Sequence, residues 1–196
     1  MTRPLAIFDF DKTLTEKDTL WAFLQYMSST REIIRNSLFL SPLLIGYKTG
    51  LLSQNKVKEQ VFSNFFGGME ADKFNRQCHN FAMEQLPGIE NSSALEKLTW
   101  HKEEGHRIVV VSASIENYLI PWCREKGIEG IGTQLEQQQG LITGKFKTPN
   151  CYGPEKVRRL KSLIDLEEYT PIYAYGDSRG DYEMLALADH PYFRAF

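Results

Sequence analysis

Two aspartates separated by one residue follow a short apolar run near the start of the chain, in the segment AIFDFDKTLT at residues 6–15. If that run continues as a strand to Asp9, the side chains of Asp9 and Asp11 lean toward one site and Phe10 points into the core. A carboxylate there can attack the phosphorus of a phosphate whose charge a cation neutralises. A second carboxylate can protonate the leaving oxygen and then deprotonate the water that cleaves the acyl phosphate. The pair therefore predicts covalent phosphoryl chemistry, with a turn or a helix cap as the alternative.

The register of this motif decides which aspartate attacks. Read from Asp11, the letters DKTLT look like the phosphorylation loop of a transport ATPase. In that register the residue two positions on is Thr13, which cannot act as an acid or a base, and a pump also needs membrane spans that this sequence lacks. We therefore expect Asp9 to be the nucleophile and Asp11 the proton carrier.

Three further positions along the chain carry groups suited to phosphate oxygens. Thr13 offers a hydroxyl and a backbone N–H. In VVVSAS, the hydroxyl of Ser112 and nearby N–H groups such as that of Ala113 can bind a phosphate oxygen where a helix begins, although serine often only caps a helix. Lys156 falls in the first turn of the helix expected at 153–164, where a cation is disfavoured unless an anion lies nearby. A solvated surface lysine is the alternative for Lys156.

The segment YGDSRGDYEM, residues 175–184, contains two more aspartates in a turn with glycines. Asp177 and Asp181 are suited to holding Mg²⁺ through carboxylate and water oxygens. A hard cation also explains why neither histidine nor cysteine accompanies them. We expect the side-chain oxygens of residues 9, 11 and 177 to gather around one divalent ion, with Ser112 and Lys156 facing it.

A sheet must position three of these clusters, because those at Asp9, Ser112 and Asp177 each follow an apolar run rich in β-formers. The runs are LAIF, IVVV and IYAY, and helical patterns at 90–105, 115–127 and 153–164 separate or follow them. Alternating strands and helices predict an α/β fold, a doubly wound Rossmann-like parallel sheet with its site beyond the carboxyl ends of the strands. The segment HPYFRAF is expected to be the last strand.

Residues 16–84 interrupt this alternation with several helical patterns and no strand-like run. We expect an inserted all-helical cap over 16–84 and a Rossmann-like core formed by 1–15 together with 85–196. The aromatic residues of the insertion are expected to form the cap's own core; the alternative is that 39–47 forms an apolar wall for the substrate. His101 and His106 are five positions apart, wrong for one helical face, and are expected to face solvent.

The composition is that of an ordinary globular protein. The 196 residues are 42% hydrophobic and carry a net charge of −2, which gives no electrostatic case for a nucleic-acid partner. Three widely separated cysteines predict no disulfide framework and favour a cytoplasmic, reducing location. The uncharged run at 36–47 is too short to cross a bilayer, which leaves contact with a membrane surface open. The oligomeric state is not indicated.

In order and spacing, the motifs resemble those of the haloacid dehalogenase-like (HAD) phosphatases. The matching residues are Asp9-Phe10-Asp11-Lys12-Thr13, Ser112, Lys156 and the run Gly176–Asp181. The helical insertion resembles the C1-type cap of subfamily IB, the branch that contains phosphoserine phosphatase. The resemblance covers nearly the whole chain.

The resemblance implies a role for each matched residue. Asp9 would form an aspartyl-phosphate, and Asp11 would be the general acid and base. Ser112 and Lys156 would bind the phosphoryl oxygens, and Lys156 would also offset the charge of Asp9. The Asp9 carboxylate, the Asp11 backbone carbonyl and Asp177 would hold Mg²⁺. Asp181 would support this metal site through water or Lys156.

Three departures from the pattern bear on the substrate. Asp18 stands where the relatives use a longer acid to recognise an amino acid, and a helix cap is its alternative role. Gln60 stands at the expected cap arginine, and Gly180 replaces the usual asparagine. The expected substrate is a small phosphate ester such as phosphoserine or a similar compound. The alternatives are a lipid-type phosphatase of the phosphatidylglycerophosphatase kind and a catalytically silent phosphometabolite-binding protein.

Overall fold

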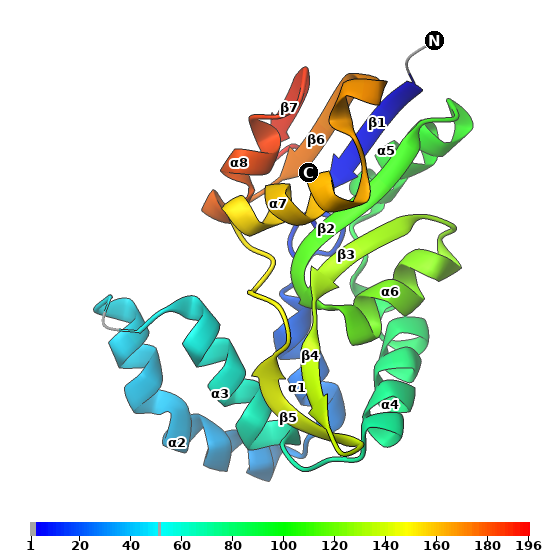
Figure 1. Ribbon diagram of the computed structural model, residues 1–196. Coiled ribbons are helices and arrows are strands. Elements are labelled where there is room, and N and C mark those ends of the chain that lie inside the picture. The colour runs from blue at the N-terminus through cyan, green and yellow to red at the C-terminus, as the bar shows by residue number, and fades with distance from the viewer. Residues whose placement is uncertain (1–2, 51) are drawn as a thin grey trace.

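The computed structural model describes residues 3–50 and 52–196, and its centre is a five-stranded parallel sheet (Figure 1). The strand order is β3-β2-β1-β6-β7, and every neighbouring pair is parallel. The strands are β1 (Arg3–Phe8), β2 (Arg107–Ile115), β3 (Glu129–Thr133), β6 (Tyr169–Gly176) and β7 (His190–Phe193). The α/β fold and the last strand expected from the sequence are confirmed.

Buried apolar side chains cover both faces of this sheet, as an all-parallel sheet requires. The covering helices are α5 (Ser92–Glu103), α6 (Glu116–Glu125), α7 (Pro154–Leu163) and the short α8 (Tyr182–Leu185). In β1, Ala6 and Phe8 pack in one core with α5 and α6, whereas Leu5 and Ile7 pack in a second core with α7 and α8. All four side chains are fully buried. The continuous apolar run thus follows from burial on both faces.

The pair His101 and His106 departs from the expectation that both face solvent. His101 is fully buried, and its Nδ1 lies 2.7 Å from Nδ1 of His106. Its Nε2 lies 3.0 Å from the hydroxyl of Tyr175. Residues five positions apart do not share one face of a helix, but His106 is not helical, because α5 ends at Glu103. The chain then turns back through Gly105 at φ +71°, which brings His106 next to His101.

Four helices follow β1. They are α1 (Thr19–Met27), α2 (Thr30–Lys48), α3 (Gln54–Phe66) and α4 (Ala71–Glu84), and a 3-10 turn, η1 (Leu86–Ile89), leads back to α5. Phe23 of α1 lies at the centre of their aromatic contacts, with ring centroids 5.3 Å from Phe66, 5.8 Å from Phe74 and 5.1 Å from Phe81. These rings belong to the same buried cluster as Phe8 of β1. The aromatic cluster expected for the insertion is therefore present, but it is continuous with the core of the sheet and is not a core of the cap alone.

Other apolar residues of this region lie outside that core. Trp21 is 50% exposed, and Ile34 and Leu38 of α2 are 57% and 70% exposed, because they lie on faces that no other described element covers. The apolar wall considered for 39–47 depends on side chains that lie outside the described residues, namely those of Phe39, Leu44, Ile45 and Tyr47. None of the described helices combines the length and apolar character needed to cross a bilayer.

A β-hairpin that sequence analysis did not predict packs against α3. Its strands β4 (Leu135–Gln138) and β5 (Leu141–Phe146) form a separate antiparallel sheet, which Figure 1 shows beside α3 and away from the parallel sheet. The contact is close at Gly144, where an added Cβ would lie 2.2 Å from the Cα of Ser63. The hairpin comes from the part of the sequence assigned to the core, so the limits 16–84 for the cap remain a prediction and leave this hairpin out.

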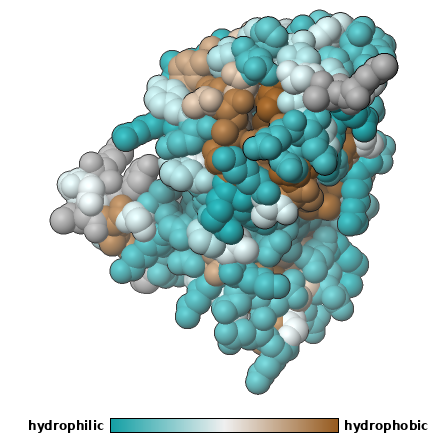
Figure 2. Space-filling model, turned by 45° about the horizontal axis from the view of Figure 1, so that its top comes forward, coloured by the Kyte–Doolittle hydropathy of each residue, from teal (hydrophilic) through white to brown (hydrophobic). Residues whose placement is uncertain are grey.

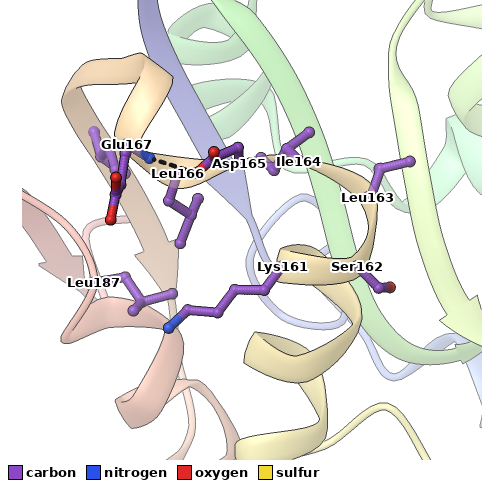
Figure 3. Close-up of a pocket in the computed structure, with 9 residues that line it drawn as sticks. Lys161, Ser162, Leu163, Ile164, Asp165, Leu166, Glu167 and Leu187 are labelled. Atoms are coloured by element: carbon purple, nitrogen blue, oxygen red, sulfur yellow. Dashed lines mark hydrogen bonds between the residues drawn. The ribbon is translucent and has the colours of Figure 1, made fainter.

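The surface away from the carboxyl ends of the strands has a pocket that both polar and apolar residues line. On the face shown in Figure 2, hydrophilic residues cover most of the surface and hydrophobic residues gather in one area. A pocket of about 680 Å³ lies between the end of α7, the 3-10 turn η2 (Leu166–Glu168) and the first half of β6 (Figure 3). The aspartates singled out in the sequence follow the carboxyl ends of the strands, at the other end of β6.

Candidate active site

The predicted chemical groups meet at the carboxyl ends of β1, β2 and β6. Asp9 follows β1 directly, and its backbone N–H donates to the carbonyl of Tyr175 at 2.9 Å, which extends the pairing with β6 by one residue. A cavity of about 280 Å³ opens here. Its lining includes Asp9, Asp11, Lys156, Asp177 and Asp181 from the core and Lys58 from α3.

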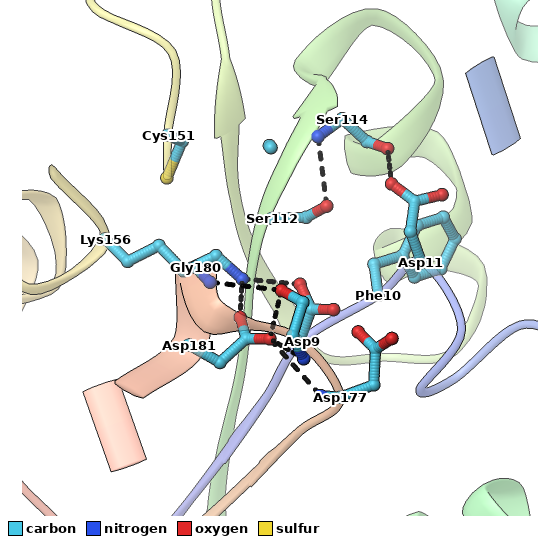
Figure 4. Close-up of polar contacts among 12 residues, drawn as sticks. Asp9, Phe10, Asp11, Ser112, Ser114, Cys151, Lys156, Asp177, Gly180 and Asp181 are labelled. Atoms are coloured by element: carbon cyan, nitrogen blue, oxygen red, sulfur yellow. Dashed lines mark hydrogen bonds and ion pairs between the residues drawn. The ribbon is translucent and has the colours of Figure 1, made fainter. Parts of the chain in front are cut away.

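Lys156 is the central cation of this site (Figure 4). Its Nζ lies 2.5 Å from Oδ1 of Asp9 and 2.6 Å from Oδ1 of Asp181, and its side chain is only 2% exposed. Burial acts to lower the pKa of Lys156, but attraction to Asp9 and Asp181 outweighs burial and raises it. A lysine in the first turn of a helix was expected to need a nearby anion, and two carboxylates lie beside Lys156.

Three carboxylates form a cluster that fits a hard cation. Oxygens of Asp9, Asp177 and Asp181 all lie within 4.8 Å of one another. Burial raises the pKa of Asp9 to about 7, with Lys156 opposing the rise, and burial also raises the pKa of Asp177. One lysine leaves an excess of negative charge among three acids, so a divalent ion with oxygen ligands suits this site.

Asp181 also fixes the loop that carries Asp177. Its Oδ2 accepts hydrogen bonds from the backbone N–H of Ser178 (2.9 Å), the hydroxyl of Ser178 (2.9 Å) and the N–H of Asp177 (3.2 Å). The Ser178 side chain in turn caps the 3-10 turn η3 (Arg179–Asp181). Gly176 permits this approach, because an added Cβ would lie 2.5 Å from the Cβ of Asp181.

The carboxylate of Asp11 lies outside this cluster of three acids, although Asp11 lines the same cavity as Asp9. Its Oδ1 accepts from the N–H and the hydroxyl of Thr19 at 2.7 and 2.6 Å, and its Oδ2 accepts from the hydroxyl of Ser114 at 2.6 Å. The expectation that side-chain oxygens of residues 9, 11 and 177 gather around one point is therefore wrong for Asp11. The reason is the three donors that hold its carboxylate near α1 and β2.

Of the residues proposed to bind the substrate, some line the cavity and others are buried beside it. Ala113 and Asp18 line the cavity, and Asp18 also caps α1 by accepting from the N–H of Trp21 at 3.1 Å. Ser112 is fully buried, and its hydroxyl accepts from the N–H of Ser114. Strand β2 continues past Ser112 to Ile115, and α6 begins at Glu116, within one residue of the helical pattern expected at 115–127.

Thr13 lies in the tight turn that follows Asp11. Its backbone N–H donates to the carbonyl of Phe10 at 3.3 Å, so this N–H is used inside the turn and not left for a ligand. Its hydroxyl is buried and has no hydrogen-bond partner among the described residues. Lys12 makes the turn with φ +60°, a conformation that few residues other than glycine adopt readily.

Lys58 is a site residue that the sequence did not reveal. It lies on α3, its Nζ donates to the carbonyl of Ala113 at 3.4 Å, and it lines the same cavity as Asp9. Burial lowers the pKa of Lys58, and Asp11 opposes this. Gln54, one helical turn earlier, also lines the cavity. Their spacing of four residues places both on one face of α3, but the sequence does not indicate that this face, and not the face of Lys56, meets the cavity.

Comparisons with known proteins identify the family. The family model for haloacid dehalogenase-like hydrolases matches residues 6–186. The chain belongs to this family. Protein CicA of Caulobacter vibrioides is 33% identical to this hydrolase over 194 residues, which are 98% of this chain and 86% of CicA. A histidinol-phosphatase of Neisseria meningitidis is 27% identical over 204 residues, which cover 95% of this chain and 88% of the relative.

Solved structures share the fold of this haloacid dehalogenase-like hydrolase. A protein of unknown function from Bordetella pertussis superposes with a TM-score of 0.79 at 23% identity, over 95% of this chain and 87% of that one. A substrate-bound phosphoserine phosphatase superposes with a TM-score of 0.68 at 18% identity, over 96% and 84% of the two chains. At these identities the likeness concerns the fold alone.

Proposed function

We propose that this hydrolase is a Mg²⁺-dependent phosphatase that cleaves a phosphomonoester through an aspartyl-phosphate on Asp9. The observation that carries the proposal is the buried contact of Lys156 with Asp9 beside the carboxylates of Asp177 and Asp181. A nucleophilic carboxylate needs positive charge around the phosphate that it attacks. Lys156 supplies one charge, and the acidic cluster is suited to hold a second.

The reaction divides into two displacements at phosphorus. First, an oxygen of Asp9 attacks the phosphorus, the bond to the leaving oxygen breaks, and that oxygen takes a proton from Asp11. Second, a water oxygen attacks the phosphorus, the bond to the Asp9 oxygen breaks, and Asp11 takes the water's proton. Asp9 and Asp11 are thereby restored, and inorganic phosphate leaves.

Mg²⁺ would be held by the carboxylates of Asp9 and Asp177 and the backbone carbonyl of Asp11, with Asp181 supporting them. When bound, it supplies positive charge that offsets the negative charge of the phosphate and the cluster. Lys156 contacts both Asp9 and Asp181 and so reduces the repulsion between their carboxylates. Ser112 and Ala113, at the end of β2, are the proposed contacts for the phosphoryl oxygens.

The size and lining of the cavity support a small, polar leaving group. Its volume of about 280 Å³ is lower than the range of about 300–1,000 Å³ usual for drug-sized ligands. Asp18, Gln54 and Lys58 line it beside the catalytic groups, so the leaving group meets both an acid and a cation. A phosphorylated amino acid or amino alcohol fits this lining. The histidinol-phosphatase among the relatives acts, by its name, on such a compound.

The exposed side chains of α2 favour a second candidate, a phosphatase for a lipid phosphate monoester. Ile34 and Leu38 are more than half exposed, and large exposed apolar side chains close together are typical of interaction surfaces. This candidate uses the same chemistry at Asp9 and differs in the leaving group. A substrate panel containing phosphoserine, histidinol phosphate and a lysophospholipid phosphate monoester separates the two candidates by their kcat/KM values.

Hydrolysis of p-nitrophenyl phosphate tests the activity itself. We expect turnover by the wild type with Mg²⁺, loss of turnover with EDTA, and recovery when Mg²⁺ is returned. Asp9→Asn should show no turnover above background, whereas Asp72→Asn, an exposed aspartate on α4, should match the wild type. Normal turnover by Asp9→Asn removes the proposed mechanism. Binding of phosphate esters without turnover by the wild type favours a silent metabolite-binding protein instead.

A further inference from the structure

A buried cluster of three hydroxyl groups lies beside the carboxylate of Asp11, and two of them bind it. We propose that Thr19, Ser114 and Tyr118 are positioning residues that hold Asp11 for its two proton transfers. The inference rests on the proposed function, since it assigns these residues a part in the same reaction. It adds three side chains to which the sequence analysis gave no role, although Ser114 is the last residue of the segment VVVSAS.

The first layer of contacts consists of the donors to Asp11. The two oxygens of the carboxylate are divided between two elements: Thr19, the first residue of α1, binds Oδ1, and Ser114 of β2 binds Oδ2. The distances of 2.6–2.7 Å are typical of bonds to a charged acceptor. Since both oxygens are held, rotation of the carboxylate breaks at least one bond.

The second layer is Tyr118 of α6. Its hydroxyl lies 3.1 Å from Oγ of Ser114 and 3.1 Å from Oγ1 of Thr19, and these two hydroxyls lie 2.9 Å from each other. Each hydroxyl has one proton to donate. The protons of Thr19 and Ser114 go to Asp11, so the proton of Tyr118 goes to one of those two hydroxyls. Tyr118 therefore supports the donors without touching Asp11.

The cluster is sealed from water. Thr19 is fully buried, Ser114 is 4% exposed and Tyr118 is 1% exposed. A buried hydroxyl that loses its partner costs about 1–3 kcal/mol, so the arrangement resists small displacements. Three elements, α1, β2 and α6, contribute one hydroxyl each, and Asp11 joins them to the turn after β1. Thr19 and Ser114 thus hold the proton carrier directly, and Tyr118 holds their two hydroxyls.

A purely structural cluster would make a different prediction from a positioning cluster. If the hydroxyls only satisfy one another, their removal lowers the free energy of unfolding and leaves both chemical steps unchanged in the folded protein. If they position Asp11, their removal slows the steps that need its proton. With p-nitrophenyl phosphate, the leaving phenolate needs little protonation, so the second displacement is the step that should slow.

Rapid-mixing kinetics with p-nitrophenyl phosphate can separate these cases. Thr19→Val keeps the branched shape and the backbone N–H but removes the hydroxyl, and Tyr118→Phe removes only the supporting hydroxyl. In both variants we expect a burst of p-nitrophenolate, up to one equivalent, at close to the wild-type first-step rate. The steady-state rate that follows should fall at least about tenfold, since acid–base catalysis contributes about 10²–10⁴-fold. Thr19→Ser should recover most of the loss.

The controls keep the inference separate from the proposed function. Tyr182→Phe, which removes the hydroxyl of an exposed tyrosine, should leave both phases unchanged. Folding of each variant is checked by thermal unfolding, and Ser114→Ala replaces any variant that does not fold. Folded variants with wild-type steady-state rates, or with both phases slowed equally, overturn the positioning role. A wild type without turnover overturns the proposed function first.

Discussion

The ammonium of Lys156 lies 2.5 Å from the Oδ1 of Asp9, a residue 147 positions earlier in the chain, and both side chains are buried. The same ammonium reaches Asp181 at 2.6 Å. A charge removed from water is expensive unless partners surround it. The ion pair joins the segment after β1 to α7. We therefore expect both the stability of the fold and the proposed activity of Asp9 to depend on it.

Replacement of Lys156 by methionine should lower both stability and turnover. The variant keeps the volume of the side chain but leaves the buried carboxylates of Asp9 and Asp181 without their cation, which costs about 3–5 kcal/mol. Urea unfolding in EDTA measures this loss without a metal ion to replace the charge. Lys161→Met, on the exposed side of the same helix, should change the free energy of unfolding by less than about 0.5 kcal/mol. Equal stability of the two variants would contradict the account.

Lys58 should contribute to substrate binding from α3. A hydrogen bond from a charged donor is worth about 1.5–3 kcal/mol, so Lys58→Ala should lower kcat/KM roughly 10- to 100-fold. Lys56→Ala provides the control, because Lys56 is exposed and lies two positions earlier on the same helix. Steady-state kinetics on the best substrate of the panel gives both values. If the two variants behave alike, Lys58 has no specific part in the site.

The buried His101 should make the protein sensitive to acid. Burial, with a smaller effect of His106, lowers the pKa of His101 from 6.5 to about 3. A lowered pKa means that the unfolded chain binds a proton that the folded protein does not, so this part of the stability is present above pH 6.5 and is lost as the pH falls toward about 3. At pH 5 the loss is about 2 kcal/mol relative to neutral pH.

Urea unfolding at pH 7.5 and pH 5 measures this effect. His101→Gln should lose less stability between these two values than the wild type does. His79→Gln, an exposed histidine on α4, should show the wild-type difference. A His101→Gln variant with the full wild-type loss would show that another group causes the acid sensitivity.

The sheet and its helices could be predicted because their patterns are local. The runs before Asp9 and Asp177 are apolar on both faces, and the helix at 153–164 starts with a proline and has a lysine that needs an anion. Each of these features arises from burial or helix geometry within a few residues. The arrangement of parallel strand ends then brings distant motifs together.

The features that could not be predicted depend on packing between distant segments. The hairpin strands are short: β4 reads LEQQ, and β5 reads LITGKF, with a glycine and a lysine. The alternation typical of a strand is therefore weak, and the contact of the hairpin with α3 exists only in the folded chain. The orientation of Asp11 depends on Thr19 and Ser114, which belong to different elements. Lys58 and Lys56 have the same side chain and lie on the same helix. They differ only in which of them lies on the face of α3 that lines the cavity.

The most direct test of the central claim is the isolation of the phosphorylated protein. The wild type is mixed with a radiolabelled phosphate ester and Mg²⁺, quenched in acid within one turnover, and digested into peptides. The account predicts a hydroxylamine-sensitive label on the peptide that contains Asp9, and no label on that peptide in Asp9→Asn. A label on another residue, or turnover by the wild type without any labelled protein under single-turnover conditions, would contradict it.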